Sequence, residues 1–222
     1  MDPKLTARGM SLKLRVELGK LPMQRLALAS YVGDPDACAA LTALAAEGCG
    51  EAPPDRPESF DLWLPGLKAY GQGVVLRTSL AFSRLALLQW REIRRELKEK
   101  SAWHLCYPLA YDLVIAAEAC LAYRLPDRLA YLTKTLSQAE DAPYDLHHSD
   151  NLPRHAQLMA LFVHTARIVL PLCWSEAFDA IGRNLHEFWP KEKTRRNIVR
   201  THLIPWALYE QAEADPILEH PT

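Results

Sequence analysis

Apolar residues recur every three or four positions along most of the chain, which is the period of an amphipathic α-helix. The longest such stretch spans residues 73–100 and predicts one long helix. Its last ten residues mix charges of both signs, which is typical of a solvated helix end. The predicted buried stripe contains Leu76, Leu80, Ser83, Leu87 and Trp90.

A second strong helix is predicted over residues 102–123, followed by a shorter one over 125–139. Because proline is tolerated in the first turn of a helix, Pro108 leaves a later start, nearer Tyr107, as the alternative for the second helix. Glu118 is an isolated carboxylate among alanines of this helix, and we expect an arginine to pair with it. The predicted buried face contains Trp103, Cys106, Ala110, Val114, Ala117 and Leu121.

The N-terminal third predicts three short helices, over residues 12–20, 23–32 and 37–47. The last two are separated by Gly33-Asp-Pro-Asp36, which combines a glycine suited to a helix C-terminus with an N-capping aspartate. The proline-rich residues 48–58 predict a linker or a long surface loop.

Residues 142–151 form the clearest predicted break, because a proline is clustered there with Asp, Asn and Ser. Beyond it, one apolar face runs through 158–172 to Pro171, and another helix is predicted over 174–189. A last helix is predicted over 194–211, where Pro205 should kink or divide it.

These elements predict an all-α protein of about eight to ten helices, packed as an antiparallel bundle or a short repeat-like stack. A length of 222 residues suits a single domain, 1–222. Within it we expect a subdivision into N-terminal helices at 1–58, central helices at 59–141 and C-terminal helices at 152–222.

The composition of the chain excludes several classes of protein. Twenty-six basic residues balance 27 acidic ones, which excludes a globally basic nucleic-acid binder. Only 9 glycines occur, and the chain has no glycine-rich phosphate loop and no Gly-x-Ser-x-Gly motif. Five scattered cysteines favour reduced thiols, and the chain shows neither a signal peptide nor a membrane-length apolar run. We therefore expect a cytoplasmic protein that uses no cofactor and no membrane.

Two stretches carry candidate chemistry. His147, His148, Asp150 and His155 are residue types that bind zinc or iron, but they show no recognised metal-site spacing. A solvated loop is the favoured interpretation, and a metal-dependent hydrolase is the alternative. His164 lies beside an apolar face and is expected to be a hydrogen-bonded core or boundary residue.

The second stretch, residues 191–202, is the concentrated positive patch of the chain. On a helix, Lys193, Arg196 and Arg200 fall close to one face, with Arg195 adjacent. Such a face suits an acidic protein partner, and it could also contact nucleic-acid phosphates.

Three Ala-rich or Leu-rich segments cover residues 25–40, 115–122 and 202–208, the last followed by Asp215-Pro. Together they resemble segments of a group of uncharacterised all-helical bacterial proteins, some of which are regarded as immunity proteins of toxin systems. The resemblance implies a helical fold and no catalytic residues.

Together these observations favour a non-enzymatic bacterial interaction module, such as an adaptor, a regulator or an immunity-type inhibitor, that binds a protein partner. The alternatives are a nucleic-acid-associated regulator that uses residues 191–202 and a metal-dependent hydrolase that uses residues 145–155.

Overall fold

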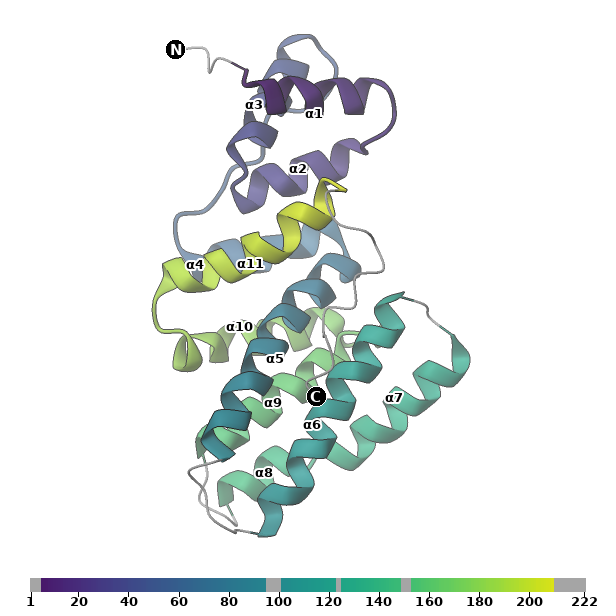
Figure 1. Cartoon of the computed structure of the whole chain (residues 1–222), viewed down its shortest axis with the longest axis vertical. Coiled ribbons are helices and arrows are strands. Elements are labelled where there is room, and N and C mark those ends of the chain that lie inside the picture. Colours follow the sequence, from purple (N-terminus) through teal and green to yellow (C-terminus); the bar gives the residue numbers. More distant parts are fainter. Residues whose placement is uncertain (1–4, 95–100, 123–124, 149–152, 210–222) are drawn as a thin grey trace. The chain divides into compact units, whose positions relative to one another are not determined.

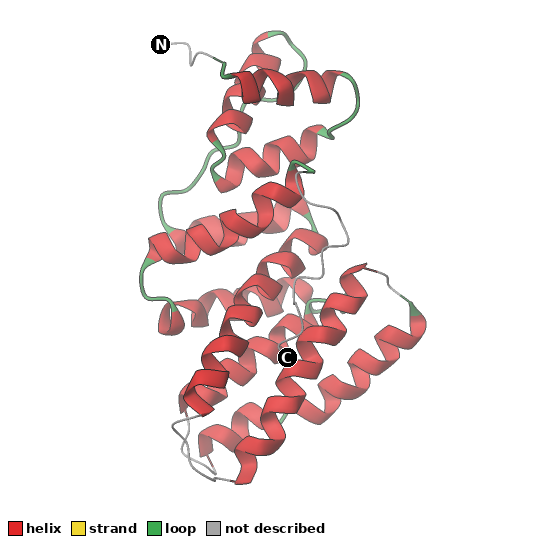
Figure 2. Cartoon of the chain, in the orientation of Figure 1, coloured by secondary structure: helices red, strands yellow, loops and turns green. Residues whose placement is uncertain are grey.

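The computed structural model describes residues 5–94, 101–122, 125–148 and 153–209, with the side chains of all of these except 91–94, 101–105 and 148. Throughout this range the regular structure is helical, as Figure 2 shows. The prediction of an all-α protein is confirmed. The described residues divide into two compact units, 5–70 with 191–209 and 71–190. These units do not coincide with the subdivision expected from the sequence.

Unit 1 joins the N-terminal helices to the last helix of the chain (Figure 1). Helix α3 packs against both α1 and α2, and α11 packs against α2. The elements are α1 (Ala7–Glu17), α2 (Met23–Val32), α3 (Pro35–Ala46), α4 (Phe60–Gly66), the 3-10 helix η1 (Leu67–Tyr70) and α11 (Glu192–Ala207).

The junction between α2 and α3 follows the predicted capping pattern. Gly33 ends α2 in a left-handed conformation with φ 102°, which glycine adopts without a Cβ clash. Asp34 then caps α3 by accepting a hydrogen bond from the Ala37 backbone N–H at 2.8 Å. The predicted irregular segment, residues 48–58, is also confirmed.

A cluster of aromatic rings forms much of the core of unit 1. Tyr31 of α2 stacks on Trp63 of α4 with ring centroids 6.1 Å apart. The Tyr31 hydroxyl donates to the Trp63 carbonyl at 2.7 Å, and the Trp63 indole N–H donates to the Tyr31 carbonyl at 3.2 Å. Phe60 and Tyr70 pack against the same pair. These reciprocal bonds fix α4 against α2.

Unit 2 is a bundle in which α6 and α9 are the central helices. Helix α6 packs against α5, α7 and α9, and α9 also packs against α5, α8 and α10. Figure 1 shows α5, α6 and α7 side by side. The elements are α5 (Gln72–Arg94), α6 (Ser101–Ala122), α7 (Pro126–Ala139), α8 (Ala142–His148), α9 (Pro153–Arg167) and α10 (Trp174–Phe188).

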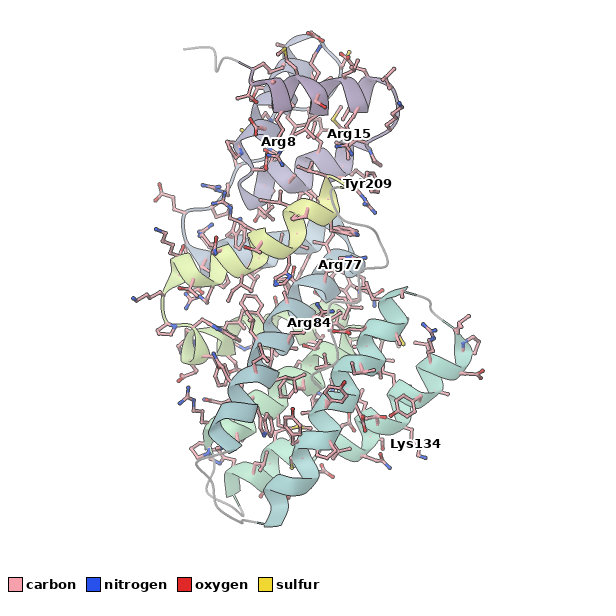
Figure 3. The ribbon with its side chains drawn as sticks, in the orientation of Figure 1. Arg8, Arg15, Arg77, Arg84, Lys134 and Tyr209 are labelled. Atoms are coloured by element: carbon pink, nitrogen blue, oxygen red, sulfur yellow. The ribbon has the colours of Figure 1, made fainter. Side chains whose placement is uncertain are left out.

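The stripe predicted on α5 is confirmed, since all five of its residues are buried. It includes a polar position, Ser83, whose hydroxyl shares a 2.8 Å hydrogen bond with Thr165 of α9. The adjacent Arg84 is also buried, and its Nε donates to Glu118 of α6 at 2.6 Å (Figure 3). The expected arginine partner of Glu118 is therefore confirmed.

The predicted bounds of the second long helix, 102–123, agree with α6, whereas the alternative start near Tyr107 is wrong. Helix α6 begins at Ser101 and continues through Pro108, because a long buried face, including Leu113 and Val114, offsets one missing backbone hydrogen bond. The predicted break at 142–151 is also wrong. Most of the predicted break at 142–151 is helix α8. There Ala142 and Leu146 are buried one turn apart, and Pro143 occupies the first turn, where proline is tolerated.

In unit 1, the predicted start of the first helix is wrong. Helix α1 begins at Ala7 rather than near residue 12, because the Thr6 hydroxyl caps it by accepting from the Gly9 backbone N–H at 2.9 Å.

In the part of the chain that the structure describes, no helix is long and apolar enough to cross a membrane.

Candidate interaction surface on α11

Helix α11 carries the positive patch predicted from the sequence. It begins at Glu192, whose carboxylate suits the first turn, and it packs on α2 through buried residues such as Ile198 and Val199. The helix spans Glu192–Ala207 in the described range, whereas the sequence predicts 194–211. Pro205 lies in the last turns without dividing the helix.

Arg196 is fixed in place by contacts on every side of its guanidinium. Its Nε donates to Glu192 one turn earlier at 2.8 Å. Its Nη2 donates to the carbonyls of Pro57 and Glu58, and its Cζ lies 4.8 Å from the ring centroid of Trp63. Arg196 therefore holds the end of the segment 48–58 against α11, and its Nε and Nη2 donors are used within unit 1.

Arg195 does not belong to the exposed patch, although the sequence placed it beside the basic face. Its side chain is buried, and its Cζ lies 4.7 Å from the ring centroid of Phe60. The reason is helical geometry, since position 195 shares a face with the buried Ile198 and Val199. Arg195 is part of the packing between α11 and α4.

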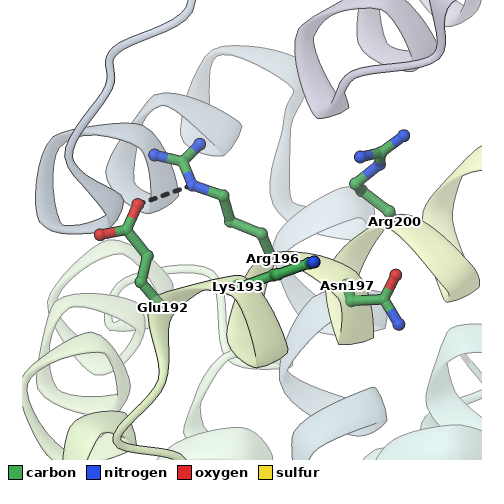
Figure 4. Close-up of a pocket in the computed structure, with 5 residues that line it drawn as sticks. All are labelled: Glu192, Lys193, Arg196, Asn197 and Arg200. Atoms are coloured by element: carbon green, nitrogen blue, oxygen red, sulfur yellow. Dashed lines mark hydrogen bonds and ion pairs between the residues drawn. The ribbon is translucent and has the colours of Figure 1, made fainter.

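Lys193 and Arg200 remain as the outward cations of α11. Together with Glu192, Arg196 and Asn197 they line a partly open pocket of about 280 Å³, which we call the α11 pocket (Figure 4). Arg200 donates one hydrogen bond to the Gly33 carbonyl at 2.8 Å. Among the described residues, no carboxylate forms an ion pair with Lys193 or Arg200, and the Asn197 amide makes no hydrogen bond.

Arg56 adds a further cation beside this pocket, which sequence reasoning missed. A Cβ built on Gly33 would clash with Arg56 Nη1 and would lie 3.6 Å from Arg200 Cζ. The two guanidinium groups therefore meet at the same glycine. Arg56 is exposed and has no carboxylate partner in the described part of the chain. No local signal marks it, because residues 48–58 lack any periodic pattern.

The acidic groups near the pocket are already paired. Hydrogen bonding from Arg196 lowers the pKa of Glu192, so this carboxylate stays ionised as a partner of Arg196. Asp34, next to Gly33, accepts from Arg8 at 2.8 Å and from the Ala37 backbone N–H. Neither carboxylate forms an ion pair with Lys193, Arg200 or Arg56 in the described part of the chain.

The histidine-rich stretch is spread over different surroundings. His147 is exposed on α8, whereas His155 of α9 is buried and meets the Trp90 ring edge-on at 6.1 Å between centroids. Asp150 and the side chain of His148 lie outside the described residues. Within the described range, no group of three or more His, Cys, Asp or Glu side chains could hold a metal ion.

His164 is partly buried on α9, in agreement with its expected place at the boundary of the core, but its buried Nδ1 has no hydrogen-bond partner among the described residues, contrary to the prediction. Burial, followed by the positive charges of Arg167 and Arg183, lowers its pKa to about 4. The imidazole is therefore neutral near pH 7.

Comparisons with protein-family models, curated proteins and solved structures give no match to this chain.

Proposed function

We propose that this protein is a non-enzymatic interaction module that binds an acidic segment of a protein partner at the α11 pocket. The observation that carries the proposal is the pair Lys193 and Arg200, which face one pocket and have no carboxylate partner among the described residues. An acidic side chain placed between them would form charge-assisted hydrogen bonds that the protein itself does not supply.

The surroundings of the pocket support this proposal. Arg196 is held by Glu192, two carbonyls and the Trp63 ring, so one wall of the pocket is ordered before any partner arrives. A preformed wall lowers the entropic cost of association. The finer roles of bacterial adaptor, regulator or immunity-type inhibitor, and a cytoplasmic location, belong to the same proposal and follow from the family resemblance and the composition.

A nucleic-acid-associated regulator is the second candidate, because the same positive surface could contact phosphates. Two of the four cations predicted for this surface, Arg195 and Arg196, are engaged inside unit 1. Fewer phosphate contacts remain than an extended nucleic-acid strand requires, and this favours the protein partner.

The test is the binding of a fluorescently labelled hexaglutamate peptide to the full chain, followed by anisotropy at low and high salt. We expect salt to weaken binding and the double variant Lys193→Glu/Arg200→Glu to reduce affinity by more than about tenfold. Lys20→Glu and Lys134→Glu are the matched controls, because both lysines are exposed and lie outside the pocket.

Equal binding by the double variant and the controls would contradict the proposal. Tighter binding of a single-stranded oligonucleotide than of the peptide, lost in the same double variant, would replace it with the nucleic-acid alternative. A protein retained from a cell extract by the wild type and lost with the double variant would identify the partner.

A further inference from the structure

Three cationic residues and one acidic residue line the α11 pocket. Lys193 and Arg200 line the pocket, and Arg56 lies against Gly33, the same glycine that Arg200 contacts. Glu192 is the one acidic residue lining the pocket, and it is bonded to Arg196. In the described part of the chain, three positive charges at this place have no carboxylate partner.

Arg56 and Arg200 also lie near each other beside Gly33. Arg200 is anchored by its bond to the Gly33 carbonyl, and Arg56 packs so closely on Gly33 that a Cβ there would clash. Two like charges at one glycine repel each other, and an anion that contacts both would relieve that repulsion. Planar guanidinium groups suit the oxygens of carboxylates and phosphates.

The number of donors distinguishes between these two anions. A carboxylate has one charge and two oxygens, whereas a phosphoryl group has a charge near −2 and three strong acceptor oxygens. The pocket offers the Lys193 ammonium, the outward nitrogens of Arg200 and the Asn197 amide, which makes no hydrogen bond in the described chain. In Figure 4, Lys193 extends along α11 in the direction of Asn197.

From this arrangement we infer that the α11 pocket takes a phosphoryl group on the acidic segment of the protein partner, anchored by Lys193 and Arg200 and assisted by Arg56. The inference rests on the proposed function and specifies its ligand. Arg196 is a positioning residue in this inference, because its Nε and Nη2 donors hold Glu192, Pro57 and Glu58. It forms the fixed wall against which the phosphoryl group sits.

Two peptides test the inference on the full chain by isothermal titration calorimetry. One contains a phosphoserine flanked by two glutamates on each side, and the other has glutamate in place of the phosphoserine. We expect the phosphopeptide to bind at least about tenfold more tightly, because a dianion makes more charge-assisted hydrogen bonds than a carboxylate. Inorganic phosphate should compete for the site, and acetate at the same ionic strength should not.

Two single variants locate the site. Arg56→Gln should reduce the preference for the phosphopeptide more than it reduces binding of the glutamate peptide, because it removes the charge at the edge of the pocket. Lys20→Gln, an exposed lysine in the same unit, should change neither. Circular dichroism of each variant shows whether the fold is retained.

Equal affinities for the two peptides, both reduced by Lys193→Gln, would overturn the phosphoryl inference and leave the proposed acidic partner in place. Failure of both peptides to bind would overturn both proposals. Binding of a single-stranded oligonucleotide more tightly than the phosphopeptide would overturn the inference in favour of nucleic acid.

Discussion

Arg84 and Arg200 show how differently the two units use the same side chain. Arg84 of unit 2 is buried between helices and bonded to Glu118, with side-chain exposures of 6% and 17%. Arg200 of unit 1 is exposed and bonds only a backbone carbonyl among the described residues. A buried guanidinium requires a compensating charge, whereas an exposed one is solvated by water. Arg84 therefore serves the fold, and Arg200 is available for a partner.

The largest effect is expected from breaking the buried pair. Glu118→Gln leaves the Arg84 guanidinium in the core without its carboxylate, and we expect the free energy of unfolding to fall by about 3 kcal/mol. Urea denaturation followed by circular dichroism measures the loss.

The double variant Arg84→Met/Glu118→Met is the control, because it removes both charges and keeps apolar volume. We expect it to recover to within about 1 kcal/mol of the wild type. If Glu118→Gln alone were as stable as the wild type, the assignment of Arg84 to the fold would be wrong.

A smaller effect is expected from His164 of unit 2, and it depends on pH. Its pKa is about 4 in the folded protein and near 6.5 in an unfolded chain. Between these values the unfolded state binds the additional proton, so stability falls as the pH drops from about 6.5 to about 4. We expect a loss on the order of 2 kcal/mol over this window.

His164→Gln isolates that contribution, because the carboxylates that titrate over the same range are common to both proteins. The free energy of unfolding of the wild type minus that of the variant should decrease as the pH falls from about 6.5 to about 4. A difference that is independent of pH would show that the imidazole is not kept neutral by its surroundings.

The smallest effects on stability are expected on α11, where replacing Arg196 should cost more stability than replacing the outward Lys193. Arg196→Ala removes bonds to Glu192, Pro57 and Glu58 and the contact with Trp63, and should destabilise unit 1 by about 1–2 kcal/mol. Lys193→Ala should stay within about 0.5 kcal/mol of the wild type.

Thermal unfolding of the two variants checks this contrast. Equal destabilisation would mean that Lys193 also supports the fold, and it would weaken the case for the α11 pocket as a binding surface. Arg196→Lys should be intermediate, because an ammonium keeps the charge without the planar stacking and bidentate geometry of a guanidinium.

Periodicity predicted the elements best where many residues share one face. The α5 stripe agrees with the structure, because its residues are buried at steps of three or four positions. The span of α2 also agrees, because Pro22 precedes its first residue and Gly33 ends it. Periodicity failed at α8, where Ala142 and Leu146 are the buried residues within the described side chains of 142–147, a pattern too short to outweigh the turn-forming residues around it.

The candidate site was predictable only in part. Lys193, Arg196 and Arg200 could be placed on one helix face from their spacing, because that geometry is local. Arg56 could not be associated with them, since it lies in an irregular segment far away in the sequence. The surroundings of Arg195 and Arg196 could not be predicted either, because they depend on Phe60 and Trp63, whose positions are set by the packing of α4.

The sequence by itself determined an all-α protein, the capped turn at Gly33 and Asp34, and a positive stripe on the last helix. Hydrophobic period, capping and charge spacing act over one or two turns and can be interpreted locally. Only the tertiary structure decided which cations are engaged and which face outward. Pairing of Arg84 with Glu118, fixation of Arg196 by residues 57 and 58, and the meeting of Arg56 with Arg200 all join segments distant in the chain.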